Sequence, residues 1–311
     1  MKRRYPQPLF TAESLRSASK FFRALTNACR AVHPARMSAR FISWFLLVVL
    51  CGSAHFAEAA SDAQPRPKRL LLIGQGPDGH PAASHEFMAG VKILEKLLAP
   101  IQGLQTTLVK ADEPWPEGPG LIDQADGVAL YLTQGAQWMQ VDPKRHAALK
   151  RLAERQGGIV ALHWAVGAKD EQYIQGQLDL LGGTRGGPQR KYKVLETDVK
   201  VLDRAHPILA GVKDFRINDE FYYRLDFVKP PAKTHPLLSA SIDGNDEVVC
   251  WSWERPSGGR SFGFVGIHFH SNWKRPEYRH LATQGILWSL GMQIPKEGLN
   301  VDIDEKLLEL N

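Results

Sequence analysis

Residues 157–165 read Gly-Gly-Ile-Val-Ala-Leu-His-Trp-Ala. The four apolar residues after the glycine pair form a continuous run, which is typical of a parallel strand buried on both faces. The run ends at His163, a position that carries a nucleophilic Cys or Ser in several α/β folds. A histidine there is a candidate general base or metal ligand, and the alternative is a structural histidine bonded to the backbone.

The segments on either side of this strand alternate between strand and helix patterns. Further strands are expected at 69–73, 104–110, 127–132, 192–202, 248–253 and 263–268. Helices are expected at 84–98, 142–155 and 276–290, and a Pro- and Gly-rich loop at 113–120. This alternation predicts an α/β three-layer sandwich whose mostly parallel sheet is covered by helices on both faces. Ligands of such sheets bind at the carboxyl ends of the strands, here residues 74–85, 133–138 and 163–167.

The charge of the chain argues against nucleic acid as a partner. The 311 residues are 43% hydrophobic and 23% charged, as in ordinary globular proteins, and the formal net charge is +6. Residues 1–59 hold nine Lys or Arg and two acids, so the rest of the chain has 30 basic and 31 acidic residues. Since phosphate backbones are bound by basic surfaces, this neutral body lacks the electrostatic signature of a nucleic-acid-binding domain.

The first 59 residues carry the three parts of a secretory signal peptide. Arg36 and Arg40 precede an apolar run at 41–50, which is shorter than the roughly 20 residues of a membrane span. The sequence Ala-Glu-Ala at 57–59 then provides a cleavage site. We therefore expect an exported protein, periplasmic or extracellular, without a stable membrane span after cleavage; an uncleaved anchor is the alternative.

The expected boundaries are a leader at 1–59, a linker at 60–68, one domain at 69–292 and an acidic tail at 293–311. Either Met1 or Met37 can start the leader. Cys29 and Cys51 lie in the leader, which leaves Cys250 alone in the rest of the chain. An exported chain with one cysteine has no intramolecular disulfide, and the apolar surroundings of Cys250 predict a buried strand residue.

Three histidines are expected at the same edge of the sheet. His85 lies at a helix start after the first strand, His163 ends the strand described above, and His268 ends the strand at 263–268. Converging histidines can chelate zinc or another divalent metal, and without a metal they can act as acid and base. His270 is a weaker candidate, because it shares a face with His268 only if that strand continues.

Acidic and aromatic residues adjoin in Asp-Glu-Phe-Tyr-Tyr at 219–223. Carboxylates beside aromatic rings suit the hydroxyls and faces of sugars, although the same run fits an ordinary edge strand. Asp219 and Glu220 are therefore candidates that assist catalysis. The candidate substrate-binding residues are Trp164, Tyr222 and His206.

Residues 74–79 match the G-x-G-x-x-G pattern directly after the first strand. A dinucleotide site needs the third glycine at the opening of a helix, whereas Pro77 interrupts this loop and the helix is expected only near Ser84. No acidic residue ends the second strand. The loop is therefore interpreted as a flexible active-site loop, and nucleotide-dependent redox chemistry is the lowest of the alternatives.

Together these segments resemble the ThuA-like family, named for trehalose utilisation. The matching segments, in chain order, are His85, 157–165, 206–208, 219–222, 258–268 and 285–288. The resemblance covers residues 69–292 and implies a fold similar to class I glutamine amidotransferases and flavodoxin-like proteins. Because His163 replaces the cysteine that glutaminase chemistry needs, that activity is excluded.

The resemblance also implies a role in sugar metabolism. The leading hypothesis is an exported isomerase, lyase or hydrolase that acts on a trehalose-type disaccharide or keto-glycoside by histidine-based or metal-assisted chemistry. The other class is a non-catalytic saccharide-binding protein. Converging histidines would favour catalysis and scattered ones would favour binding. A homodimer is compatible with the aromatic-rich, neutral body.

Overall fold

The computed structural model describes residues 66–230 and 234–310, so the predicted leader and most of the predicted linker lie outside the described residues. Its strands are β1 Lys68–Gly74, β2 Leu104–Lys110, β3 Gly127–Tyr131, β4 Gly158–Leu162, β5 Gly183–Thr184, β6 Lys191–Val201, β7 Phe215–Tyr223, β8 Asp226–Phe227, β9 His235–Ile242, β10 Asn245–Glu254 and β11 Arg260–Phe264. Its α-helices are α3 Phe87–Leu98, α4 Gly118–Gln124, α5 Gly135–Val141, α6 Pro143–Glu154, α7 Ile174–Leu181 and α8 Pro276–Ser289. Short 3-10 helices include η1 His163–Val166, η3 Pro207–Leu209 and η5 Glu305–Leu308.

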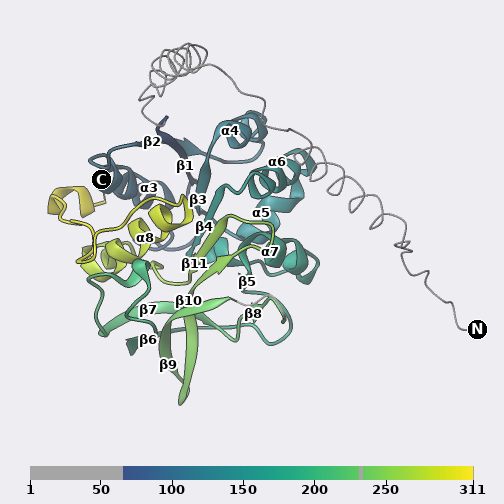
Figure 1. The fold of residues 1–311 in the computed structure, drawn as a ribbon. Coiled ribbons are helices and arrows are strands. Elements are labelled where there is room, and N and C mark those ends of the chain that lie inside the picture. Colours follow the sequence, from purple (N-terminus) through teal and green to yellow (C-terminus); the bar gives the residue numbers. More distant parts are fainter. Residues whose placement is uncertain (1–65, 231–233, 311) are drawn as a thin grey trace, which may run out of the picture. The chain divides into compact units, whose positions relative to one another are not determined.

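Nine strands form one sheet in the order β2-β1-β3-β4-β11-β10-β9-β6-β7 (Figure 1). The first five strands pair in parallel. With β11 counted as the fifth strand, their order is the 2-1-3-4-5 of flavodoxin-like folds. The remaining pairs are antiparallel and extend the sheet beyond β11. The predicted α/β fold is confirmed, while the antiparallel extension was not predicted as a unit.

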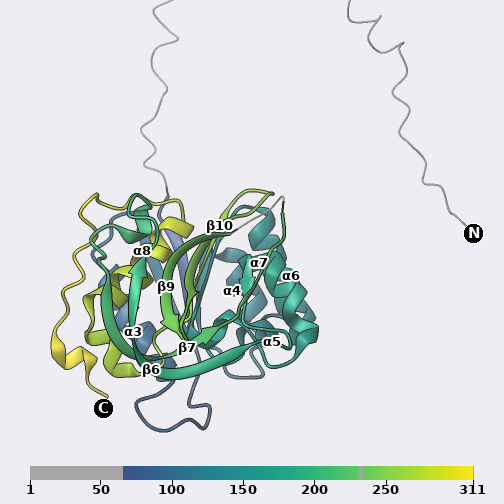
Figure 2. The same cartoon turned by 90° about the horizontal axis from the view of Figure 1, so that it is seen from below.

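Helices cover both faces of the sheet, so the fold has the expected three layers. Figure 2 shows α3 and α8 on one side and α4, α5, α6 and α7 on the other. The strands between them are apolar because both faces are buried: every residue of β3 and β4 is buried. Gly158 is required where β4 passes the end of α8, since a Cβ there would lie 2.8 Å from the Ser289 carbonyl oxygen.

Local chemistry sets several of the element boundaries. Asp142 caps α6 by accepting a hydrogen bond from the Lys144 amide, with Pro143 in the first turn, as the sequence predicted. The Asp243–Gly244 pair joins β9 to β10, and both residues have positive φ, as a tight hairpin turn requires. Cys250 is buried in β10 as a free thiol.

Several boundaries differ from the sequence predictions. Helix α3 begins only at Phe87, and α4 occupies the second half of the predicted loop at 113–120 and continues to Gln124. Strand β11 ends at Phe264 rather than at His268. The physical reason for the last difference is the Asp219 carboxylate, which accepts the amide hydrogens of Ile267 and His268 that a longer strand would give to a neighbour.

The predicted acidic tail packs onto the domain over its described residues. The Val301 and Leu308 side chains are buried, and the Val301 carbonyl accepts a hydrogen bond from Arg279 of α8. Among the described residues, no helix combines the length and the hydropathy needed to cross a bilayer.

Candidate metal centre

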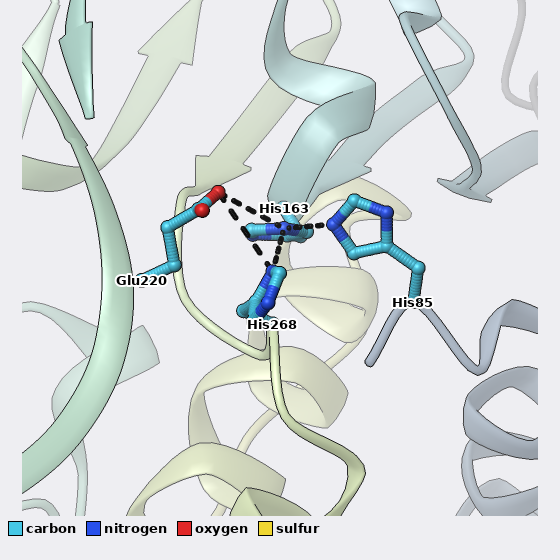
Figure 3. Close-up of side chains that lie close together, drawn as sticks. All are labelled: His85, His163, Glu220 and His268. Atoms are coloured by element: carbon cyan, nitrogen blue, oxygen red, sulfur yellow. Dashed lines mark hydrogen bonds and ion pairs between the residues drawn. The ribbon is translucent and has the colours of Figure 1, made fainter. Parts of the chain in front are cut away.

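Three histidines and a glutamate meet at the carboxyl edge of the parallel strands (Figure 3). His85 lies on the loop after β1, His163 directly follows β4, and His268 lies on the loop after β11. The His163 Nε2 atom is 2.9 Å from His85 Nε2 and 3.2 Å from His268 Nδ1. Glu220 of β7 places its Oε1 atom 3.9 Å from His163 Nε2 and 3.7 Å from His268 Nδ1. The sequence predicted that the three histidines lie at this edge of the sheet, and the structure brings them together.

Strained backbone holds these side chains in place. His85, His163 and Ile267 have φ values of +54°, +52° and +75°, in a region that non-glycine residues rarely adopt. The two loops that carry His85 and His268 are tied together, because the His85 amide donates to the His268 carbonyl at 3.1 Å. Such conformations persist only where the surroundings enforce them, and they concentrate at functional sites.

Fixed acceptors determine the protonation of two of the rings. The Val265 carbonyl oxygen lies 2.9 Å from His163 Nδ1, and an Asp78 carboxylate oxygen lies 2.8 Å from His85 Nδ1. A carbonyl oxygen can only accept a hydrogen bond, so His163 Nδ1 carries a hydrogen. The ionised Asp78 carboxylate can also only accept, so the ring hydrogen of His85 is on Nδ1. Both Nε2 atoms therefore present lone pairs to each other at 2.9 Å.

A cation between or beside the facing lone pairs would remove their repulsion. The Tyr222 hydroxyl lies 3.2 Å from His163 Nε2 and can donate one hydrogen, which leaves the His85 lone pair without a donor. Zinc–nitrogen bonds of about 2.0–2.1 Å arranged tetrahedrally separate ligand atoms by roughly 3.4 Å. The spacings from His163 Nε2 and His268 Nδ1 to their neighbours, 2.9–3.9 Å, bracket that value, and all four ligand atoms lie within 4.8 Å of one another, so the donor set fits a divalent transition metal.

Burial keeps the three imidazoles neutral. It lowers the pKa of His163 well below the ordinary value, and the neighbouring His85 and His268 lower it further. Desolvation also lowers the pKa of His268 to about 4. For His85, burial outweighs the hydrogen bond from its ring to Asp78, so its pKa is lowered as well. Neutral imidazole is the form that binds metals.

Asp219 and Glu220 have different roles because successive residues of a strand point to opposite faces. The Asp219 carboxylate is fully buried and accepts hydrogen bonds from the Ile267, His268 and Glu220 amides and the Tyr278 hydroxyl, at 2.7–3.1 Å. Burial raises its pKa to about 6 against these bonds. The sequence made Asp219 a candidate that assists catalysis, and the structure places its carboxylate where it shapes the loop of His268.

Tyr222 lies beside the cluster, on the same face of β7 as Glu220. Its ring stacks on His163 with centroids 4.9 Å apart. Burial raises the pKa of Glu220, while a hydrogen bond with Tyr222 lowers it in part. The two residues thus place an acid and a hydroxyl next to the histidine nitrogens.

The family model for ThuA, described as trehalose utilisation, matches residues 71–289. The chain belongs to the ThuA family. The family is associated with carbohydrate utilisation in general. No protein with a curated description matches the chain.

Solved structures of two ThuA-like proteins share the fold. The one from Parabacteroides merdae is 17% identical, with a TM-score of 0.57. Its alignment covers 79% of this chain and 100% of the Parabacteroides chain. The one from Bacteroides uniformis is 15% identical, with a TM-score of 0.56, and covers 74% of this chain and 94% of its own. A glutamine amidotransferase from Thermotoga maritima aligns at 12% identity with a TM-score of 0.40, over 78% of this chain and 99% of its own.

The glycine-rich loop of this ThuA-family chain does not form a dinucleotide fingerprint. Its last glycine, Gly79, precedes the first residue of α3 by eight positions. The loop instead supplies Asp78, whose carboxylate contacts His85 and His80. Burial raises the pKa of Asp78, but the hydrogen bonds from these rings outweigh it and lower the pKa overall. Sequence reasoning missed Asp78, and its only signal was an acid between glycines ahead of two histidines.

The other predicted residues occupy different places in the ThuA fold. Trp164 is buried beside the cluster, with its ring 5.3 Å from that of His85. His270 faces away, since its Nε2 lies 3.1 Å from the Leu308 carbonyl oxygen. His206 lies at the opposite edge of the sheet, near Ser252 and Trp288. The structure therefore does not bring His206 to the candidate site, because η3 packs against the far end of α8.

Proposed function

We propose that this ThuA-family protein is an exported, metal-dependent enzyme that acts on an oxidised or keto-glycoside. The observation that carries the proposal is the pair of Nε2 lone pairs of His85 and His163, whose opposite nitrogens are bonded to Asp78 and to a carbonyl. Carboxylate–histidine pairs of this kind orient and strengthen metal ligands. The convergence supports catalysis over the alternative of saccharide binding without chemistry.

His85, His163 and His268 would hold the metal, which we propose to be zinc or another divalent transition metal. When bound there, such a metal supplies a positive charge that polarises a sugar carbonyl or hydroxyl oxygen. Three protein ligands with a fourth position left for substrate are typical of catalytic zinc sites. Glu220 lies beside that position, with its side chain 12% exposed.

Glu220 is the proposed general base. Its carboxylate is the acidic group of the cluster that retains contact with solvent, and burial raises its pKa. A carboxylate with a raised pKa can accept a proton from the carbon beside a sugar ketone and return it to a neighbouring position. Tyr222 lies on the same face of β7 with its hydroxyl 3.2 Å from His163 Nε2, and Trp164 provides an apolar wall beside His85.

Deuterium exchange tests this role. Incubation of a keto-glycoside with the protein in D2O should accelerate loss of the proton beside the ketone, measured by NMR. Glu220→Gln should reduce the rate by about 10²–10⁴-fold, as expected for removal of a general base. Glu254→Gln, an exposed acid at the far edge, is the matched control. Exchange at the buffer rate with the unaltered protein, or equal rates in Glu220→Gln, would contradict the proposal.

The proposal of export rests on the leader pattern at residues 1–59. It is tested by the amino-terminal sequence of the protein recovered from the periplasm or medium of an expressing cell. We expect a chain that begins at Ala60. Retention of residues 1–59 in the cytoplasmic fraction would contradict export.

A further inference from the structure

A buried arginine lies next to the candidate metal centre. Arg185 follows β5, and only 6% of its surface is exposed. Its backbone is bonded to the segment that follows His163: the Arg185 amide donates to the Val166 carbonyl at 2.9 Å, and its own carbonyl accepts from Ala168 at 3.1 Å. The position of this side chain is therefore tied to the turn that carries the central histidine.

The guanidinium of Arg185 has no hydrogen-bond or ion-pair partner among the described residues. Its Nε and Nη1 atoms are buried and make no hydrogen bond there, and no carboxylate oxygen of residues 66–230 or 234–310 lies within 4.0 Å of it. Glu220 belongs to the same site but does not reach ion-pair distance. Burial of an unpaired charge is costly, so proteins normally pair it.

The other buried arginines differ from Arg185 in having at least one hydrogen-bond or ion-pair partner. Arg145 donates from Nε to the Trp138 carbonyl and forms an ion pair with Glu113 at 2.7 Å, although neither of its Nη atoms meets the geometry of a hydrogen bond. Arg279 donates to two carbonyls, and Arg255 donates to the Ser261 hydroxyl and to two carbonyls. Each of these guanidinium groups has a hydrogen-bond or ion-pair partner within the described chain, whereas that of Arg185 contacts only aromatic rings there.

Aromatic rings connect Arg185 to the metal centre and to solvent. Its guanidinium carbon lies 4.5 Å from the centroid of the Tyr222 ring, which also stacks on His163. It lies 5.9 Å from the ring of Tyr192, a side chain that is 62% exposed. The Tyr222 ring therefore lies between Arg185 and His163, one of the proposed metal ligands. Tyr192 provides a surface aromatic ring near Arg185 on which a sugar can stack.

We propose that Arg185 forms an anion subsite of the candidate active site, and that the saccharide substrate carries an oxyanion, either a carboxylate or a phosphate. This inference rests on the proposed function and specifies its substrate class. A guanidinium presents paired donors that match the two oxygens of such groups. A neutral sugar would leave the buried charge unpaired, whereas an anionic sugar would satisfy it.

The test measures the affinity of the full chain for glucose, glucuronate and glucose 6-phosphate by calorimetry at constant ionic strength. We expect at least one of the charged sugars to bind roughly 10- to 100-fold more tightly than glucose, as a charge-assisted hydrogen bond allows. The difference between the carboxylate and the phosphate identifies which oxyanion the subsite takes.

Two variants separate a subsite from general surface charge. Arg185→Gln should remove the preference for charged sugars. Arg190→Gln, which alters a nearby and partly exposed arginine bonded to the Gly187 carbonyl, should retain it. Equal affinities for neutral and charged sugars in the unaltered protein, or no binding of either charged sugar, would overturn the proposal. So would an unchanged preference in Arg185→Gln.

Metal analysis of the same samples distinguishes this inference from the proposed function. Bound metal without a preference for charged sugars would overturn the anion subsite alone. A preference that depends on Arg185 in a protein that takes up no metal would support the subsite and contradict the metal-dependent chemistry.

Discussion

His163 and His206 lie at opposite ends of the strands of the same sheet, and their ring nitrogens have different hydrogen-bond partners. His163 is fully buried and His206 is half-buried, and burial lowers the pKa of both. In His206, Nδ1 accepts a hydrogen bond from the Ile208 amide and Nε2 lies 3.2 Å from the Ser252 hydroxyl. In His163, one nitrogen is bonded to a carbonyl and the other faces two more histidines.

The difference shows that burial alone does not identify a functional histidine. His206 has both nitrogens satisfied within the protein, and its neighbour His235 bonds Asp203 at 2.9 Å. The His163 cluster directs lone pairs at one another, which is unfavourable without a cation. The protonation that each hydrogen-bond partner enforces is therefore the property that separates the two regions.

The largest effect on stability in this comparison is expected from Asp219, the buried acid that is bonded to the loop of His268. Asp219→Ala leaves three amides and the Tyr278 hydroxyl without their acceptor, so we expect a loss of about 3–5 kcal/mol in the free energy of unfolding. Urea denaturation measures it. Asp203→Ala, which removes the partly exposed partner of His235, should cost less than about 1 kcal/mol. Equal losses in the two variants would contradict the proposed role of Asp219.

A smaller effect is expected on metal affinity from the partner of His85. Asp78→Asn keeps the shape of the side chain but removes the charge that orients the His85 ring. We expect a 10–100-fold weaker affinity for zinc, as for other residues that support metal ligands. Competition with a chromophoric chelator measures it, with Asp203→Asn as the matched control. Unchanged affinity in Asp78→Asn would show that this pair does not support a metal.

The smallest effect is expected at the opposite edge, from the titration of His206. Burial lowers its pKa from the ordinary value of 6.5 to about 4 in the folded chain, so the unfolded chain binds more protons between these pH values. The contribution of His206 to the free energy of unfolding is therefore fully present above pH 6.5 and is lost as the pH falls toward 4. Between about pH 7 and pH 4.5 the stability should fall by on the order of 1–2 kcal/mol more in the unaltered protein than in His206→Gln. Equal losses of stability with falling pH in the unaltered protein and in His206→Gln, measured by denaturation, would contradict this expectation.

The parallel half of the fold could be predicted because its strands are continuous apolar runs and its helices have clear periodicity. The run at 159–162 and the helix opened by Asp142-Pro143 are examples. The antiparallel half carries weaker signals, since β7 and β9 mix polar with apolar residues. The Asp243-Gly244 pair was the available signal for the hairpin of β9 and β10, because that dipeptide favours tight hairpin turns.

The candidate site could be predicted only where the sequence places a histidine at the end of a strand. The rule that ligands bind at the carboxyl ends of parallel strands brought His85, His163 and His268 together. It could not separate Asp219 from Glu220, since their roles depend on which face of β7 each occupies. It also could not find Arg185, whose importance lies in its lack of a partner among the described residues, a property that exists only in the folded chain.

The most direct test of the account is the metal content of the purified full chain after equilibration with zinc and removal of the excess. We predict about one zinc ion per chain in the unaltered protein and in His206→Ala, and none in His163→Ala, because the His163 region presents unsatisfied lone pairs and the His206 region does not. Circular dichroism shows whether His163→Ala remains folded. A chain that retains no metal, or a His163→Ala variant that is folded and retains as much metal as the unaltered protein, would contradict the account.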